Sequence, residues 1–174
     1  ASKVAPTHFC QMISRTTGFP IITVRPFLTY GPYQLSEMLI PDLIRHCLEG
    51  EKEFLMTFGE QTREFNYVVD IVENILQTAL CEKLIGEVVN IGNSVEYKVI
   101  DVASMIVQLT GTALELKIGA IPYRKGEVFR FYSSTQKFNK HIGSSPTTPL
   151  KKGLEKTIRW YNDYLIQRSR VRPK

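Results

Sequence analysis

The sequence predicts an α/β fold, and three observations support this prediction. Short apolar runs rich in β-branched residues, typical of strands, alternate along the chain with amphipathic segments of ten or more residues, typical of helices. The apolar fraction of 43% and the charged fraction of 22% are those of a globular protein rather than a disordered one. At 174 residues the chain is long enough for one ordinary domain with a sizeable core.

The first elements predicted are a helix, a strand and a second helix. The segment HFCQMISRTTG reads as the end of a helix that Gly18 closes at a C-cap position. The run FPIITVRPF follows as a short strand, and its continuous apolar character favours a buried strand of a parallel sheet. A helix is predicted for IPDLIRHCLEG, with Pro41 in its first turn and Gly50 at its end. Its expected apolar face consists of Leu43, Ile44, Cys47 and Leu48.

The rest of the chain continues the alternation. REFNYV is predicted as a strand that leads into a helix over DIVENILQTAL, where we interpret Asp70, followed by Glu73, as a helix cap. GEVVNIG and LELKIG are predicted strands, and KVIDVASMIVQLTG between them has helical apolar spacing. The last predicted helix runs from near Leu150 to Leu165.

The distribution of charge argues against a nucleic-acid-binding surface. The net charge is +5, but residues 168–174 contain Arg168, Arg170, Arg172 and Lys174 and no acid. These four positive charges leave only +1 for the rest of the chain, and 168–174 is expected to be a basic flexible tail. No apolar run approaches the ~20 residues that a membrane helix needs, so no membrane span is predicted.

Metal, hydrolase and nucleotide motifs are also missing from the sequence. The histidines do not cluster and have no acidic residue at metal-ligand spacing, so no metal site is predicted. The three cysteines, Cys10, Cys47 and Cys81, lie in apolar stretches, and we interpret them as buried reduced thiols, which suits a cytoplasmic protein. The chain contains no GxGxxG, Walker or Gly-x-Ser-x-Gly motif, so its motifs alone do not predict dinucleotide binding or hydrolysis.

Four segments occur in a family-specific order along the chain: ASK, RPFLTYGP, QTREFNYVVD and PYRKGEV, followed by PLKKGLEKTIRWYNDY. Together they resemble the second half of the extended short-chain dehydrogenase/reductase family, the NAD-dependent epimerases and dehydratases of nucleotide sugars. The resemblance implies the C-terminal part of a Rossmann-like doubly wound parallel sheet plus a small α/β substrate-binding lobe. It assigns residues 1–34 to the Rossmann-like domain and 35–167 to the lobe with interleaved Rossmann elements.

The resemblance gives the first residues of the chain a catalytic role. In the family a tyrosine stands four residues before a helix lysine, often with a serine just before the lysine, and Lys3 and Ser2 match the latter two. An ammonium near the tyrosine favours the phenolate, and it can also donate hydrogen bonds to the nicotinamide ribose of NAD or NADP. The chain is thus expected to be the C-terminal part of an enzyme, beginning just after its catalytic tyrosine. The alternative for Lys3 is a solvated terminal lysine.

RPFLTYGP follows a predicted strand, where open α/β sheets place ligands. By the resemblance, the backbone around Phe27 lies beside the cofactor carboxamide. Leu28 stands where the family commonly has an asparagine that contacts the substrate. For Tyr30, Gly31 and Pro32, simple turn chemistry is the alternative.

Arg63 and Arg124 match two family arginines that contact the diphosphate or ribose of the substrate. The planar guanidinium suits this role because it binds phosphate oxygens with two donors at once. The alternative is a pair of surface arginines that form ion pairs with Glu64 and Glu127.

The segment LIPDLIR matches the family segment that packs against the nucleotide base. By this match Leu39 and Pro41 line the base pocket, and ordinary core packing is the alternative. Many relatives have an aromatic residue for base stacking where Met56 or Thr57 falls here, and Phe58 is a candidate substitute.

Taken together, these assignments predict the substrate-binding half of an NAD(P)-dependent enzyme acting on a nucleotide-diphosphate hexose. The reaction would be 4-keto reduction, 4-epimerisation or 4,6-dehydration, and IGAIPYRKGEV and RPFLTYGP look most like the 4-keto reductases of the CDP-abequose synthase type. The alternative function is a non-catalytic nucleotide-sugar-binding module. The resemblance also implies a homodimer for the complete protein, and we expect no nucleic-acid or membrane partner.

Overall fold

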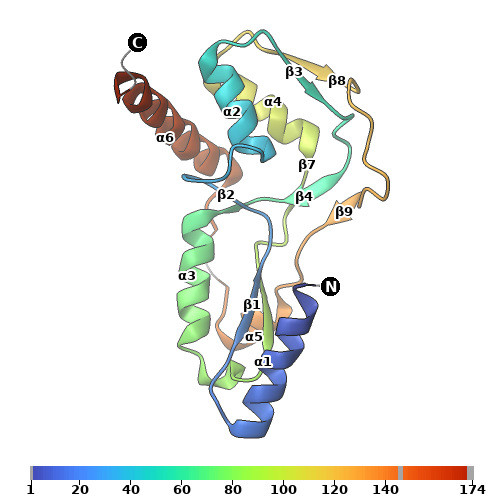
Figure 1. Cartoon of the computed structure of the whole chain (residues 1–174), viewed down its shortest axis with the longest axis vertical. Coiled ribbons are helices and arrows are strands. Elements are labelled where there is room, and N and C mark those ends of the chain that lie inside the picture. Colours follow the sequence, from blue (N-terminus) through green and yellow to red (C-terminus); the bar gives the residue numbers. More distant parts are fainter. Residues whose placement is uncertain (1, 145–146, 172–174) are drawn as a thin grey trace.

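The computed structural model describes residues 2–144 and 147–171 of the chain. Helices alternate with short strands along it, and most strand pairs are parallel, which confirms the predicted α/β class. Figure 1 shows an elongated molecule in which two groups of elements lie one above the other. We call them the lower lobe, which contains the N-terminus, and the upper lobe, which contains the C-terminal helix.

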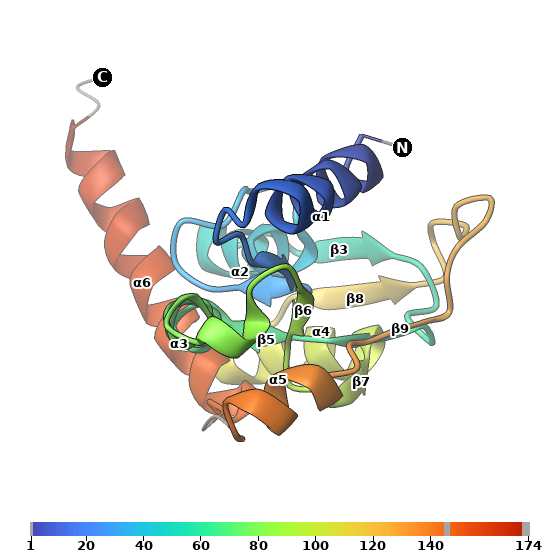
Figure 2. The ribbon, with the colours of Figure 1, turned by 90° about the horizontal axis from the view of Figure 1, so that it is seen from below.

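The lower lobe is built around two parallel strands, β1 (Thr23–Pro26) and β6 (Val88–Ile91). Figure 2 shows helix α1 on one side of this pair and helix α5 on the other. The helical elements of this lobe are α1 (Val4–Thr17), α3 (Val68–Ala79), the 3-10 helix η1 (Glu82–Leu84) and α5 (Gln136–His141). Its core consists of Ile71, Leu84, Val89, Ile91 and Phe138.

Strand β1 is parallel as predicted, but it is not buried. Arg25 and Pro26 are exposed, and the other two residues are only partly buried. Among the described residues β1 has a neighbouring strand on one side only, so its other edge stays accessible.

Helix α1 begins at Val4 and ends where predicted, at Gly18, whose φ of 71° lies in the left-handed region. Pro6 falls in the first turn, where a backbone N–H has no helical partner, so the proline removes no helical hydrogen bond. Lys3 occupies the N-cap position, and its carbonyl accepts a hydrogen bond from the Thr7 hydroxyl at 3.0 Å.

The upper lobe combines three helices with a parallel strand pair and a mixed sheet. The helices are α2 (Leu39–Glu49), α4 (Val99–Thr110) and α6 (Leu150–Val171). The parallel pair is β3 (Glu53–Met56) with β8 (Glu115–Ile118). In the mixed sheet, β4 (Thr62–Glu64) is antiparallel to β7 (Glu96–Lys98) and parallel to β9 (Arg130–Phe131). The fully buried centre of this lobe includes Leu43, Ile44, Val102, Ala103, Ile106 and Leu154.

A short parallel pair, β2 (Thr29–Tyr30) with β5 (Asn66–Tyr67), lies between the lobes. The single strand predicted for REFNYV is therefore wrong in one respect, because it is interrupted at Phe65. Up to Glu64 the chain pairs with β7 and β9, and from Asn66 it pairs with β2. The chain thus changes sheet, and lobe, at one buried phenylalanine.

The last helix extends further than predicted. α6 continues to Val171, so residues 168–171 of the predicted tail are helical, and 172–174 lie outside the described residues. The reason is local, because no glycine or proline interrupts the sequence from Leu154 to Val171. The lower lobe is not limited to residues 1–34, because it also contains α3, β6 and α5, which come later in the sequence.

Asp70 does not cap α3. The N-cap position is Tyr67, for which the described residues show no side-chain cap hydrogen bond. The Asp70 carboxylate instead accepts hydrogen bonds from the backbone N–H of Thr148 at 2.7 Å and from the Thr148 hydroxyl at 2.8 Å. It therefore connects α3 to the segment that precedes α6.

The three cysteines are free, and only Cys47 is buried as predicted, whereas Cys10 and Cys81 are partly exposed. Within the described ranges, no helix has the length and apolar character needed to cross a membrane. The same residues contain no group of three or more histidine, cysteine, aspartate or glutamate side chains that could hold a metal ion.

Candidate functional site

A pocket of about 420 Å³ opens in the upper lobe between α2, β3, β4 and the segment 121–127. One part of its wall is apolar and includes Leu28, Leu39, Phe54, Met56 and Phe65. The other part is polar and charged and includes Glu37, Asp42, Thr57, Gln61, Arg63, Arg124 and Glu127. A volume in this range, an apolar wall and a few convergent polar groups are typical of small-molecule sites.

Arg63 reaches the pocket from the middle of β4. Its Nη2 donates to Oε1 of Glu127 and its Nη1 donates to the Thr62 carbonyl at 2.7 Å. The two charged side chains are only 18% and 19% exposed. Because the pair is largely shielded from water, it holds the guanidinium in one orientation more firmly than a surface ion pair would. Other N–H groups of the guanidinium are left to bind a ligand.

Arg124 and Glu127 lie at the two ends of one tight turn. The backbone N–H of Glu127 donates to the Arg124 carbonyl at 3.0 Å. Gly126 occupies the third position of this turn with φ of 81°, a conformation that favours glycine. The RKGE sequence therefore brings an arginine and a glutamate to the same mouth of the pocket. Arg124 is exposed, and its guanidinium has no hydrogen-bond or ion-pair partner among the described residues.

Glu64 is not the partner of Arg63 that one alternative proposed. Successive residues of a strand point to opposite faces, so Glu64 faces away from the pocket that Arg63 lines. It is fully buried and accepts hydrogen bonds from Asn66, Ser94 and Ser133. Glu127 does form an ion pair with an arginine. That arginine is Arg63, and the pair lies shielded inside the pocket rather than on the surface.

Of the two residues expected to line a base pocket, the structure brings only Leu39 to the pocket. Pro41 is buried in the packing of α2 and is not among the residues lining the pocket. Two residues along a helix correspond to a rotation of about 200°, so Leu39 and Pro41 face in different directions. Met56 and Thr57 also line the pocket, but Phe58 does not, and its ring lies 6.4 Å from that of Tyr123.

Leu28 lines the pocket, but its neighbour Phe27 does not. The Phe27 N–H donates to the Ile91 carbonyl at 2.9 Å, and its own carbonyl accepts from the Thr29 hydroxyl at 2.8 Å. The Phe27 ring stacks on Phe131 of β9, with centroids 5.1 Å apart and planes at 24°. The N–H of Phe27 is thus already used within the fold, and only its carbonyl oxygen has capacity for a further hydrogen bond.

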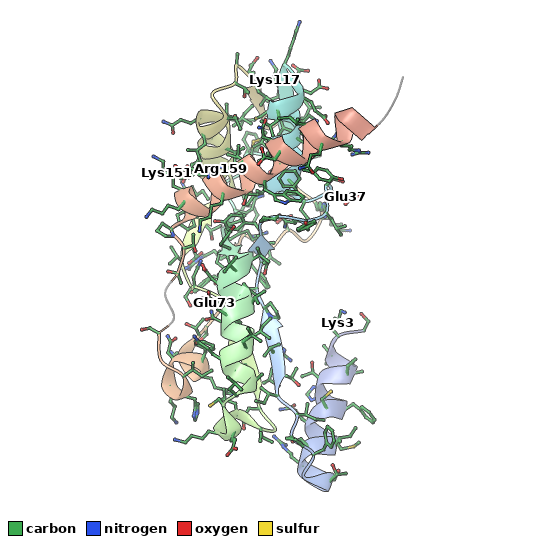
Figure 3. All side chains as sticks on the ribbon, turned by 90° about the vertical axis from the view of Figure 1, so that its left-hand side faces the viewer. Lys3, Glu37, Glu73, Lys117, Lys151 and Arg159 are labelled. Atoms are coloured by element: carbon green, nitrogen blue, oxygen red, sulfur yellow. The ribbon has the colours of Figure 1, made fainter. Side chains whose placement is uncertain are left out.

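Ser2 and Lys3 are exposed at the start of α1 and do not line the pocket. Figure 3 shows Lys3 at the end of α1 nearest the upper lobe. Its ammonium makes no ion pair with any residue in the described ranges. The structure therefore brings Leu28, Leu39, Arg63 and Arg124 together, and it leaves Ser2, Lys3, Phe27 and Pro41 outside that pocket.

Tyr30, the last residue of β2, is unsuited to acid–base chemistry. It is 1% exposed, and its hydroxyl donates to the Leu150 carbonyl at 3.3 Å. Burial raises the pKa of this phenol well above its ordinary value, so it stays neutral and structural. The turn interpretation fits Gly31 and Pro32, since the Gln34 N–H donates to the Gly31 carbonyl at 3.4 Å, but Tyr30 belongs to the strand before the turn.

The sequence did not single out Glu37, Asp42 or Gln61 as pocket residues. Asp42 could have been found, because it stands three residues after Leu39 and such residues share one face of a helix. Gln61 could not, since its place depends on the contact of the loop before β4 with the start of α4, where the Val99 N–H donates to the Gln61 carbonyl at 3.1 Å.

A model of the NAD dependent epimerase/dehydratase family matches residues 1–92. The chain belongs to the NAD-dependent epimerase/dehydratase family. The matched part of this family member runs from α1 to the end of β6 and includes Lys3, Phe27 and Arg63, but not Arg124 or Glu127.

The relatives of this epimerase/dehydratase-family chain include dTDP-D-glucose 4,6-dehydratase of Homo sapiens. The two are 32% identical over 168 residues, which cover 94% of this chain and 47% of the human protein. The chain spans about half the length of the curated relatives it matches.

Two solved structures show the same fold. An epimerase from Methanothermobacter thermautotrophicus superposes with a TM-score of 0.88 at 24% identity, over 98% of this chain and 52% of that one. UDP-glucuronic acid 4-epimerase from Bacillus cereus, solved with UDP-glucuronic acid and NAD, gives a TM-score of 0.83 at 27% identity, over 93% of this chain and 51% of that one. The Rossmann-like α/β fold of the family is thereby confirmed for this chain.

Proposed function

We propose that this chain is the nucleotide-sugar-binding part of an NAD(P)-dependent enzyme, and that the pocket of the upper lobe binds a nucleotide-diphosphate hexose. The main support is the convergence of Arg63 and Arg124, from β4 and from the turn 124–127, on one partly apolar pocket. The membership of the epimerase/dehydratase family and the UDP-glucuronic acid and NAD held by the Bacillus cereus relative agree with this proposal.

Arg63 and Arg124 are proposed to bind the diphosphate. Arg63 is already oriented by Glu127, and Arg124 is free to turn toward a ligand. Two guanidinium groups can neutralise both phosphates and donate several charge-assisted hydrogen bonds. Leu39 and Leu28 are proposed to contact the base and the sugar side of the substrate by apolar packing. Pro41 is omitted from this set because it is buried.

Lys3 and Ser2 are proposed to support catalysis from the lower lobe. An exposed ammonium without an ion-pair partner in the described structure is free to favour the phenolate of a neighbouring tyrosine and to donate to the cofactor ribose. The carbonyl oxygen of Phe27 is the proposed acceptor for the cofactor carboxamide, since the Phe27 N–H is occupied. When bound, NAD or NADP supplies the hydride acceptor or donor for the sugar C4.

Among the three reactions, 4,6-dehydration is the one we propose first, because curated relatives of the chain carry out that reaction by name. 4-Epimerisation and the 4-keto reduction of the CDP-abequose synthase type are the other outcomes. A homodimer of the complete protein is part of the same proposal. Phe9 and Met12 of α1, which are 57% and 51% exposed on one helical face, support it.

The pocket is tested by titrating the chain with UDP, dTDP, CDP and GDP and with the matching monophosphates in a calorimeter. We expect one diphosphate to bind at least about tenfold more tightly than its monophosphate, because a second phosphate adds charge-assisted hydrogen bonds. R63A and R124A should each weaken the binding of the diphosphate. R159A, on the exposed face of α6 (Figure 3), should leave that binding unchanged. Equal affinities for both phosphorylation states, or unchanged affinity in both pocket variants, would overturn the proposal.

The reaction is tested on the full-length gene product with NDP-glucose and NAD(P), followed by mass and sugar analysis of the product. Loss of water indicates a dehydratase and an inverted C4 an epimerase. Reduction of a supplied 4-keto sugar indicates a reductase. Tight diphosphate binding without any conversion would instead support the non-catalytic binding module.

A further inference from the structure

Glu64 is a buried carboxylate that the proposed function does not use. It is the last residue of β4, next to Arg63, and none of its surface is exposed to solvent. No positively charged side chain pairs with it among the described residues. Burying an ionised carboxylate is costly unless hydrogen bonds replace its lost hydration.

Four hydrogen bonds supply that replacement. Oε1 accepts from the side-chain amide of Asn66 at 2.9 Å. Oε2 accepts from the Ser133 N–H at 2.7 Å, the Ser133 hydroxyl at 2.8 Å and the Ser94 N–H at 3.2 Å. An ionised carboxylate only accepts hydrogen bonds, so these donors match its needs without conflict.

The donors come from three separate parts of the chain. Asn66 begins β5, Ser94 follows β6, and Ser133 follows β9. The backbone also approaches closely at Gly92, where a Cβ atom would lie 2.0 Å from Oε1 of Glu64. The Glu64 side chain therefore connects, by hydrogen bonds, three segments in which the chain crosses between the two lobes.

The position of this carboxylate matters because β4 and β9 pair over so few residues. Their ladder consists of Thr62 with Arg130 and Arg63 with Phe131. Beyond Phe131, the hydrogen bonds from Ser133 to Glu64 hold the two segments together in place of further ladder bonds. In this part of the sheet Arg63 lines the pocket, and the Phe131 ring stacks on the Phe27 ring.

We propose that Glu64 is a positioning residue, which holds β4 and β9 in register so that Arg63 presents its guanidinium to the diphosphate. This inference rests on the proposed function of the pocket. Gln at position 64 has nearly the same shape but only one acceptor oxygen, and its amide nitrogen would face a donor of Asn66 or Ser133. A shift of the strand of even about 1 Å is enough to spoil the alignment of a binding group.

The test is a cycle of variants titrated with the nucleoside diphosphate that binds the wild-type chain most tightly. We expect E64Q to weaken binding about tenfold, the size expected when one charge-assisted contact is lost. In the R63A background, E64Q should cause no further loss, because the group that it positions is absent. An equal loss in both backgrounds would show a general structural role and overturn the proposal.

Two further variants keep the test decisive. S133A removes one hydroxyl donor but keeps the backbone N–H, so it should give a smaller loss with the same dependence on Arg63 even if E64Q fails to fold. E115Q removes an exposed carboxylate of β8 and should leave affinity unchanged. If S133A lowers the affinity for the diphosphate equally in the wild-type and the R63A background, the proposal is contradicted.

A measurement without ligand separates this inference from the proposed function. In the free chain, E64Q or S133A should speed amide hydrogen exchange at Ser94 and Ser133 and shift the NMR signal of Arg63 Nε–H. If the wild type binds no diphosphate, the proposed function fails, while these changes would still support the positioning of Arg63. Unchanged exchange and an unchanged Arg63 signal would overturn the positioning role whatever the ligand result.

Discussion

Arg63 and Glu127 form an ion pair inside the pocket although they are 64 residues apart in the sequence. Arg63 comes from β4, and Glu127 from the turn that precedes β9. The pair joins the loop 119–129 to the mixed sheet and fixes a guanidinium beside an apolar wall.

The first prediction concerns the strength of this pair. E127Q should lower the free energy of unfolding by about 1–3 kcal/mol, because it leaves a largely buried guanidinium without its charged partner. Urea denaturation measures this change. The R63A and E127Q changes should be strongly non-additive, since both remove one interaction. Additive losses would show that the two side chains do not interact in solution.

The second prediction concerns the contact between Gly153 of α6 and Tyr30. A Cβ atom at position 153 would lie 1.9 Å from the Tyr30 hydroxyl oxygen, and Tyr30 is fully buried. G153A should therefore destabilise the chain by about 1–3 kcal/mol, as overpacking of a core does. Thermal unfolding measures the loss.

A second substitution checks the cause of that loss. Y30F removes the hydroxyl that would meet the new methyl group, so the double variant G153A with Y30F should recover part of the stability. No recovery would indicate that the ring carbon Cζ, 2.8 Å from the same Cβ position, or the helix itself is responsible.

The third prediction is a pH dependence at Glu96 of β7. Hydrogen bonds from Arg130 and Thr62 lower the pKa of this carboxyl from 4.5 to about 2. A group whose pKa is depressed by folding stabilises the fold above its unfolded pKa and loses that contribution as the pH falls. Stability should thus decline between about pH 4.5 and pH 2. In E96Q that part of the decline should disappear, and an unaltered pH profile would contradict the assignment.

The fourth prediction concerns the link between α3 and α6. Asp70 accepts two hydrogen bonds from Thr148, one from the backbone and one from the hydroxyl. D70N should cost about 1–3 kcal/mol, because a charged acceptor is lost while the partly buried donors remain. T148V should cost less, since the backbone N–H is kept. Chemical denaturation of both variants measures the order, and a larger loss for T148V would be inconsistent with the geometry.

The predictable parts of the fold were those set by neighbours in sequence. The second helix, α2, begins with Pro41 in its first turn and ends at Gly50, and both signals act locally. The two arginines that line the pocket were also singled out from the sequence, because the segments around them resemble family segments in the same order along the chain. In α2 the near neighbours in sequence decided both ends of the helix, and the sequence was sufficient.

The end of α6 was misplaced although its signals are local, but the other errors arose where a distant partner decided the outcome. The chain changes sheet at Phe65 because β2, β7 and β9 supply the partners, and none of these is adjacent in sequence. Asp70 looked like a helix cap until Thr148, 78 residues away, proved to be its donor. Helix geometry separates Leu39 from Pro41, but the packing of α2 decides that Leu39 faces the pocket and Pro41 the core.

The change of sheet at Phe65 is one of several points where the chain passes between the lobes. It crosses again after β6, after β9 and before α6, so each lobe is assembled from alternating stretches of sequence. No contiguous fragment therefore contains one lobe alone, and truncation cannot isolate either of them. The two lobes are expected to melt together in a single cooperative transition, and a protease that cuts one crossing would leave two noncovalently joined pieces rather than two independent domains.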